Sequence, residues 1–170
     1  MSEAAPGYAL PHGCDSPGRI SGTCVGHRVE IAAPPALVWD FIADFEGWQA
    51  WNPLYVQTSG RAEPGERIRF AVQLEGMKPH KGAAQVVTVR AGELLEYRVN
   101  GLGGLSKAFR FVEIEPLSAT SCAVTNGEIM GGPVGLLIVR ALGGKVGKGL
   151  EAMNLALRAV AERKWQGISG

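Results

Sequence analysis

Two charged residues, Arg110 and Glu128, stand in segments whose other large side chains are mostly apolar. Arg110 lies between Phe109 and Phe111, and Glu128 directly precedes Ile129. A charge in an apolar interior is costly unless it is paired, so inward-facing side chains here would form an ion pair or bind the polar group of a ligand. A glutamate in such a place is also a candidate general acid or base. The simpler alternative is that one or both side chains point to solvent from a half-exposed sheet.

The chain offers little other chemistry of a recognisable kind. Its three histidines do not stand at metal-ligand spacing, and none is combined with a serine or cysteine in a nucleophile motif. The three cysteines form no Cys-x-x-Cys pair, which argues against a zinc site or a disulfide framework. The glycine-rich stretches 101–104 and 143–149 lack the spacing of dinucleotide- and phosphate-binding loops. We therefore expect no metal and no cofactor.

The composition is that of one ordinary globular domain. Hydrophobic residues make up 46% of the 170 residues, charged residues make up 19%, and the net charge is +1. This balance argues against a nucleic-acid partner, which normally requires a basic surplus. The most apolar stretch, 133–142, is too short to span a bilayer and contains Arg140, so we do not expect stable membrane insertion. The first residues lack the features of a signal peptide, and together with the cysteine usage this favours a cytoplasmic protein.

The N-terminal residues differ in composition from the rest of the chain. Residues 1–25 are rich in proline and glycine and carry few large apolar side chains. Such a segment cannot offset the entropy lost on ordering, so we expect a flexible arm over 1–25. A single domain is expected over residues 26–167, and its first strand over 27–32.

A helix and a short aromatic segment are expected after the first strand. Pro35 is well placed in the first turn of a helix. The apolar residues over 37–45 repeat with helical spacing, which indicates an amphipathic helix. Trp48 and Trp51 follow in a short turn or second helix, which ends at Pro53. The two tryptophans either pin these helices to the sheet or gate the mouth of a cavity.

From residue 54 to residue 130 the hydrophobic pattern changes to a period of two, which is typical of strands. Short turns rich in glycine and proline separate the segments. Connections this short join antiparallel neighbours, because a parallel crossover needs a dozen residues or more. The expected strands are 54–60, 66–75, 81–91, 93–100, 106–115 and 120–130.

A long helix is expected over 133–166, because its apolar residues form one continuous stripe with helical spacing. The glycines at 143–149 weaken its first half, each by roughly 1 kcal/mol relative to alanine, so we expect either a kink or a broken first half, with a regular helix over about 145–165. Hairpins with helices at both ends of the run indicate an α+β fold. We expect a curved antiparallel sheet of six or seven strands wrapped around the C-terminal helix.

The sequence also resembles a known superfamily. The segment from Val29 to Pro53 (VEIAAPPALVWDFIADFEGWQAWNP) resembles the opening of the polyketide cyclase/dehydrase-like branch of the START/Bet v 1-like (SRPBCC) superfamily. The segments Phe111–Pro116 and Asn126–Gly131 resemble the last two strands of that family. The resemblance covers residues from about 27 to 165. It implies a helix-grip fold, with two short helices after the first strand and a hydrophobic tunnel between the sheet and the last helix.

The resemblance also implies which strand faces line the tunnel. It places Arg110 and Glu128 toward the cavity, although the family often has a histidine where Arg110 stands, so chemistry carried over from the family at this position is in doubt. Strand alternation and the apolar stripe of the last helix extend the candidate set. The candidate ligand-binding residues are Trp51, Tyr55, Phe70, Val72, Tyr97, Arg110, Val112, Asn126, Glu128, Met130, Leu142, Val146 and Met153.

Three functions agree with these observations. The first is binding or transport of a small hydrophobic molecule, such as a lipid, polyketide, isoprenoid or aromatic metabolite, in the internal cavity. The second is an enzyme of the cyclase/dehydratase type, in which Glu128 would be the acid–base group. The third is a protein-interaction module. A cavity in the structure would favour the first two, whereas a collapsed interior would leave only the third.

Overall fold

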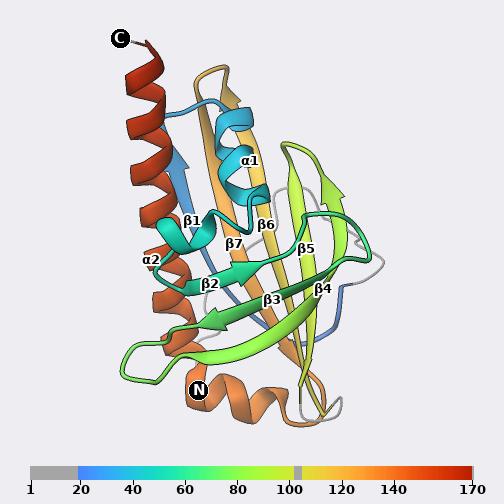
Figure 1. Ribbon diagram of the computed structural model, residues 1–170. Helices are drawn as coiled ribbons and strands as arrows, with labels where there is room; N and C mark the ends of the chain where they lie inside the picture. Colours follow the sequence, from blue (N-terminus) through green and yellow to red (C-terminus); the bar gives the residue numbers. More distant parts are fainter. Residues whose placement is uncertain (1–18, 102–104, 170) are drawn as a thin grey trace.

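The computed structural model describes residues 19–101 and 105–169, which form an antiparallel seven-stranded sheet and a long C-terminal helix (Figure 1). The strand order across the sheet is β1-β7-β6-β5-β4-β3-β2. The predicted α+β helix-grip architecture is therefore confirmed. The elements, in chain order, are β1 (Thr23–Ile31), α1 (Pro35–Ala43), the 3-10 turn η1 (Trp48–Ala50), β2 (Tyr55–Ser59), β3 (Arg67–Val72), β4 (His80–Arg90), β5 (Leu94–Gly101), β6 (Ser106–Ser118), β7 (Ser121–Gly131) and α2 (Gly135–Ser169).

The strands follow the predicted segments closely, with two differences of note. β1 begins at Thr23, before the expected start of the domain at residue 26, because its first residues pair with Met130 and its neighbours in β7. β6 continues through Pro116 to Ser118, where a turn was expected, and the pairing with β7 shifts register at this proline. A proline at a bulge leaves the ladder intact on either side. Most of the expected N-terminal arm lies outside the described residues.

The two short helices after β1 are held by aromatic packing. Pro35 stands at the start of α1, where its missing N–H leaves no hydrogen bond unmade. The second predicted helix is the single turn η1. The indole of Trp48 is fully buried, and its Nε1 donates to the carbonyl oxygens of Phe41 and Ile42, both at 3.1 Å. These bonds attach η1 to the C-terminal end of α1.

α2 is one continuous helix that bends in its first half, as the glycines predict. In Figure 1 the orange start of α2 lies across one end of the molecule, and the red remainder runs along the sheet toward the C-terminus. Gly149 allows a close approach here, because a Cβ at this position would lie 2.7 Å from Leu54 Cδ1. Within the described part of the chain, no helix has the length and apolarity needed to cross a membrane.

The sheet has a core on each of its faces. The main core lies between the concave face, α1, η1 and α2. A smaller cluster lies on the opposite face, where Ile20 packs against a group that includes Phe109 and Phe111. Arg19 covers this cluster, with its Cζ 4.7 Å from the centre of the Phe111 ring and its Nη2 2.7 Å from the buried Glu96. The residues just before β1 are therefore part of the folded structure.

Candidate ligand-binding cavity

A cavity of about 610 Å³ lies between the concave face of the sheet and the first half of α2. This volume falls within the range of roughly 300–1,000 Å³ that is typical of small-molecule sites. Most of the wall is apolar, and the polar groups come from few positions. The residues that line it are Leu54, Tyr55, Phe70, Val72, Leu74, Met77, Lys78, Pro79, His80, Val99, Ala108, Arg110, Glu128, Met130, Ile138, Leu142 and Val146.

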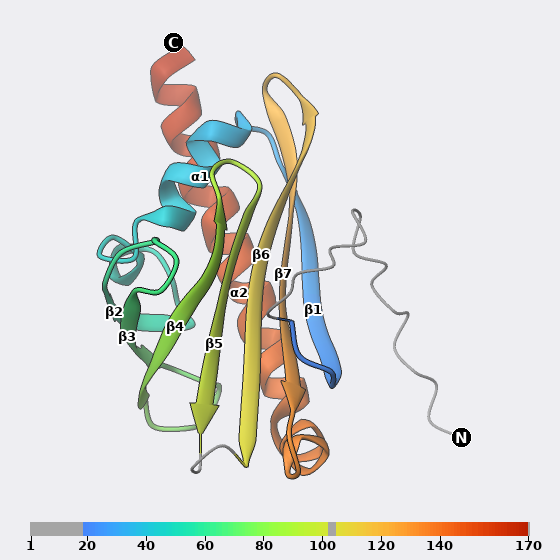
Figure 2. The same ribbon diagram turned by 90° about the vertical axis from the view of Figure 1, so that its right-hand side faces the viewer.

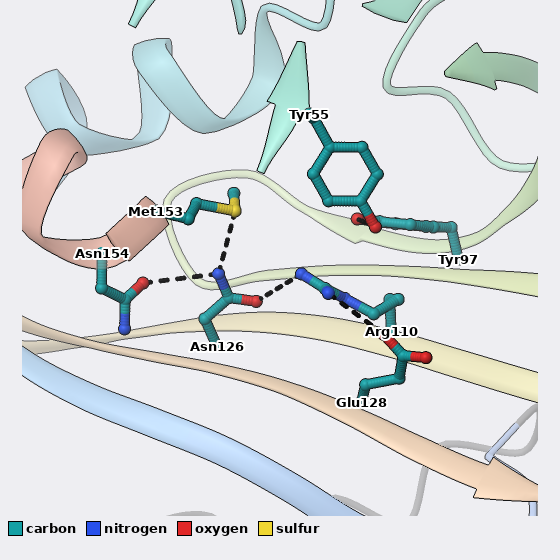
Figure 3. Close-up of polar contacts among 7 residues, drawn as sticks. All are labelled: Tyr55, Tyr97, Arg110, Asn126, Glu128, Met153 and Asn154. Carbon is teal, nitrogen blue, oxygen red and sulfur yellow. Dashed lines mark hydrogen bonds and ion pairs between the residues drawn. The ribbon is translucent and has the colours of Figure 1, made fainter. Parts of the chain in front are cut away.

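Arg110 is the central polar residue of the wall, and its side chain is only 2% exposed. Its position follows from the β6–β7 register, which places Arg110 directly opposite Glu128. Nη1 lies 3.2 Å from Glu128 Oε2, and Nη2 donates to Asn126 Oδ1 at 2.8 Å (Figure 3). Nε has no hydrogen-bond partner among the described residues. The side chain therefore keeps one buried donor for another group.

Two tyrosines face Arg110, one from the adjacent strand β5 and one from the edge strand β2. Tyr55 comes from β2 and Tyr97 from β5, and the Tyr97 hydroxyl donates to the Tyr55 hydroxyl at 3.1 Å (Figure 3). The Arg110 Cζ lies 5.3 Å from the centre of the Tyr55 ring, within range of a cation–π interaction.

These contacts set the ionisation of the three side chains. Burial raises the pKa of both phenols above the usual value, although the nearby Arg110 charge acts in the opposite direction. Burial would lower the pKa of Arg110, but Tyr55, Tyr97 and Glu128 together raise it. At neutral pH the cavity therefore presents a fixed cation next to neutral phenols.

A chain of amides connects this site to α2 and β1. The Asn126 Nδ2 lies 3.1 Å from Met153 Sδ and 3.4 Å from Asn154 Oδ1 (Figure 3). The fully buried Asn154 in turn donates through Nδ2 to the carbonyl oxygen of His27 at 2.9 Å. The Arg110 network therefore reaches the contact between α2 and β1, and it fixes the position of the helix over the cavity.

The loop between β3 and β4, residues 73–79, forms one side of the cavity mouth. Gly76 has a φ of 71°, a conformation that favours glycine, and it allows the loop to turn toward α2. Lys145 Nζ donates to the carbonyl oxygen of Glu75 at 2.5 Å, and Lys148 Nζ lies 2.9 Å from its carboxylate. The Lys148 contact lowers the pKa of Glu75. Lys145 and Lys148 thus hold the loop against the helix.

Eight of the thirteen candidate ligand-binding residues lie in the cavity wall. Tyr97 and Asn126 contact Arg110 and stand behind that wall. Trp51 lies elsewhere, because its ring packs on Phe41 and Trp48 at centroid distances of 6.5 and 6.2 Å. Val112 and Met153 are fully buried in the main core. The eight in the wall are Tyr55, Phe70, Val72, Arg110, Glu128, Met130, Leu142 and Val146.

Sequence reasoning missed several residues of the mouth and one of the network. Met77, Lys78 and His80 read as an exposed turn, and they are exposed, but the loop folds over the cavity. Asn154 had a detectable signal, since it is a polar residue inside the apolar stripe of the last helix. The other wall residues that were not predicted are Leu54, Leu74, Pro79, Val99, Ala108 and Ile138.

The described residues contain no group of three or more His, Cys, Asp or Glu side chains that could hold a metal ion. Two cysteines are described, and both are free thiols. Burial raises the pKa of Cys122 to about 11, so this thiol stays protonated and unreactive at neutral pH.

Residues 23–162 match the family described as polyketide cyclase / dehydrase and lipid transport, which is most of the chain. The chain belongs to this family. No curated protein matches its sequence. Solved structures with a similar fold include the ZhuI aromatase/cyclase from Streptomyces sp. R1128, with a TM-score of 0.69 and 19% identity over 83% of this chain and 94% of that one.

Two further structures of the same fold extend the comparison. One is a START superfamily protein from Mycobacterium smegmatis, with a TM-score of 0.64 and 22% identity, covering 82% of this chain and 97% of that chain. The other is a norcoclaurine synthase point mutant from Thalictrum flavum, with a TM-score of 0.63 and 16% identity, covering 86% of this chain and 99% of that chain. The predicted membership of the START/Bet v 1-like superfamily is thus confirmed.

The first prediction concerns the buried ion pair. Replacing Arg110 by methionine should lower the free energy of unfolding by about 3 kcal/mol, the low end for a buried pair, because Glu128 remains 18% exposed. Replacing both Arg110 and Glu128 by methionine should be less destabilising than the single change. The control is Arg98→Met, which removes an exposed hydrogen bond to Gln85. Chemical denaturation measures all three, and equal stability of R110M and R98M would contradict the assignment.

The second prediction concerns the two buried phenols. The chain has three tyrosines, so in a Tyr8→Phe variant the phenolate absorbance comes from Tyr55 and Tyr97 alone. Their phenolate absorbance should appear above the usual pKa of about 10, because burial disfavours the charged form. Above that pH the unfolded chain releases protons that the native protein retains, so the free energy of unfolding should fall as pH rises. Ionisation near pH 10 in the folded protein would show that the phenols are in contact with water.

Proposed function

We propose that this protein binds a small hydrophobic molecule in the cavity between its sheet and α2. The observation that carries the proposal is the cavity itself, about 610 Å³ with a mostly apolar wall. Burial of an apolar ligand there removes its surface from water, which is the main driving force for such binding. Family membership supports the same function, since the family is described by lipid transport as well as by polyketide cyclase and dehydrase. A function solely as a protein-interaction module was expected for a collapsed interior, whereas this interior contains a cavity.

The polar groups of the wall suggest what the ligand carries. Arg110 Nε is a buried donor without a partner among the described residues, and the Tyr55 hydroxyl accepts from Tyr97 while keeping its own proton. A ligand with an oxygen acceptor, such as a carbonyl, phenol or carboxylate, would satisfy these donors. We therefore propose an apolar ligand with one oxygen-bearing end that lies against Arg110.

We place this binding in the cytoplasm, with no role for nucleic acid. The two free thiols, Cys24 and Cys122, suit a reducing compartment. The near-zero net charge of +1 provides no general attraction for a phosphate backbone.

The third prediction tests whether the cavity is the binding site. The protein should increase the fluorescence of 1-anilinonaphthalene-8-sulfonate, an aromatic probe with an anionic group, in a saturable way. Ala108→Phe fills the cavity and should weaken binding by about tenfold or more. Ala83→Phe makes the same change on β4 next to the buried Ala84, on the other face of the sheet, and should leave binding unchanged. Equal probe binding by both variants, with unchanged melting temperatures, would show that the probe does not bind in the cavity.

A second candidate function is an enzyme of the cyclase/dehydratase type acting in the same cavity. The observation that favours it is the carboxylate of Glu128, which lines the cavity beside the Arg110 cation. A carboxylate can take a proton from a carbon between two carbonyls, and an adjacent cation stabilises the enolate oxygen that results. The carbanion then attacks a second carbonyl of the same molecule and closes a ring, and water leaves in a later step. The ZhuI protein of the same fold is named an aromatase/cyclase.

The fourth prediction separates the enzyme from the carrier. A linear poly-β-ketone thioester is incubated with the protein, and ring formation is followed by absorbance. If Glu128 is the base, Glu128→Gln should reduce the rate by roughly 100-fold or more, because the amide cannot accept the proton. Binding of the naphthalene sulfonate probe should be retained, since the size of the side chain is unchanged. If Glu128→Gln and the unchanged protein cyclise the substrate equally fast, or neither does, the enzymatic assignment of Glu128 is wrong.

A further inference from the structure

Four large apolar side chains are exposed on segments that carry residues of the cavity wall or lie next to them, and one of the four, Met77, lines the cavity itself. The four are Met77, Leu105, Leu136 and Leu137, with exposed fractions of 42%, 53%, 55% and 63%. They come from three places in the chain, the β3–β4 loop, the residue just before β6 and the start of α2. All three lie at the end of the molecule opposite the C-terminus (Figures 1 and 2). Single exposed leucines are common on proteins, whereas a group of them at one end of the molecule indicates an interaction surface.

The three segments are joined to one another. The backbone N–H of Val134 donates to the carbonyl oxygen of Leu105 at 3.4 Å, which holds the start of α2 against the residue just before β6. The Lys148–Glu75 ion pair holds the β3–β4 loop against α2. The exposed side chains therefore stand on segments that are connected to one another at one end of the molecule, and we call them together the mouth surface. It consists of Met77, Lys78, Leu105, Lys107, Leu136, Leu137 and Arg140.

The start of α2 is apolar on two faces. Ile138 and Leu142 form part of the cavity wall, while Leu136 and Leu137 are exposed to solvent. A helix segment that is apolar on nearly all sides is normally buried, so its outer face calls for a partner. The bend in α2 places this segment across the end of the molecule, where a flat partner can reach it (Figure 1).

The charged residues of the mouth surface, Lys78, Lys107 and Arg140, are all basic, and the acidic side chain of the same loop, Glu75, is paired with Lys148. The sequence has no Asp or Glu from residue 129 to residue 150 or from residue 97 to residue 112. Lys107 and Arg140 are exposed, and neither forms an ion pair among the described residues. Because the whole chain carries only +1, its positive charge is concentrated at this end. Leucines interspersed with unpaired basic residues match the chemistry of an anionic lipid surface.

We propose that the mouth surface docks on an anionic lipid bilayer. Leu136 and Leu137 enter the boundary between head groups and acyl chains, and Lys107 and Arg140 contact the lipid phosphates. The cavity mouth then faces the bilayer, so that an apolar ligand passes between membrane and cavity without crossing water. That route rests on the proposed function, whereas the docking itself does not.

The fifth prediction tests docking by sedimentation of the full chain with vesicles. The protein should bind vesicles of equimolar phosphatidylcholine and phosphatidylglycerol, bind phosphatidylcholine alone far more weakly, and dissociate as salt is raised. Leu136→Glu/Leu137→Glu should reduce binding by about tenfold or more, since it removes apolar contact and adds negative charge. Lys107→Glu/Arg140→Glu should abolish the preference for anionic vesicles.

The matched control is Leu117→Glu/Leu155→Glu, which changes two leucines with exposed fractions of 45% and 40% outside the mouth surface. It should bind vesicles as the unchanged protein does. The proposal would be overturned if Leu136→Glu/Leu137→Glu and the control Leu117→Glu/Leu155→Glu lost vesicle binding equally, or if the unchanged protein did not bind vesicles. A dimer that Leu136→Glu/Leu137→Glu dissociates without any vesicle binding would also overturn it, because the surface would then join two copies of the chain.

Probe binding keeps this test separate from that of the cavity. The Leu136→Glu/Leu137→Glu variant should still bind the naphthalene sulfonate in solution, because both side chains lie outside the cavity wall. Vesicle binding without probe binding would leave the docking surface intact and contradict the proposed ligand cavity. Probe binding without vesicle binding would contradict the docking surface and leave the proposed ligand cavity intact.

Discussion

The width of the sheet is the constraint on which the rest of this structure depends. Seven strands spaced by about 4.8 Å span roughly 29 Å, whereas one helix with its side chains is only about 10–12 Å in diameter. α2 therefore cannot cover the concave face alone. At one end, α1 and the aromatic residues around Trp48 fill the remaining space. At the other end no described segment of comparable size does so, and the cavity lies there.

An open concave face creates a second problem, because the polar groups that line it must be satisfied without water. The chain solves this with a connected network and not with isolated pairs. Arg110 bonds to Glu128 and Asn126, and Asn126 leads to Asn154 and the contact of α2 with β1. Such a network is favourable only when nearly all its members are satisfied. The same bonds that orient polar groups toward a ligand thus also hold the helix in place.

Local patterns in the sequence were enough to predict the elements of the fold. Alternation assigned Arg110 to one face of β6 and Glu128 to one face of β7, because a period of two is a property of the strand alone. That both faces line the cavity was implied by the family resemblance, and the β6–β7 register that places the two residues opposite each other comes from the structure. The mouth loop around Met77 could not be predicted in this way, since its position depends on an ion pair with Lys148 and a hydrogen bond from Lys145, both some seventy residues away. Trp51 was a candidate because it could gate the cavity mouth, but its ring packs on those of Phe41 and Trp48 instead. Asn154 was overlooked because hydrophobic residues alone defined the stripe.

The packing of Arg19 on the outer face of the sheet has a consequence for where this domain ends. The family match starts at residue 23, which is also the first residue of β1. A boundary drawn there would cut away the guanidinium that covers Phe111 and bonds to Glu96. The folded part of this chain therefore extends beyond the residues that match the family, and it includes at least Arg19 and Ile20.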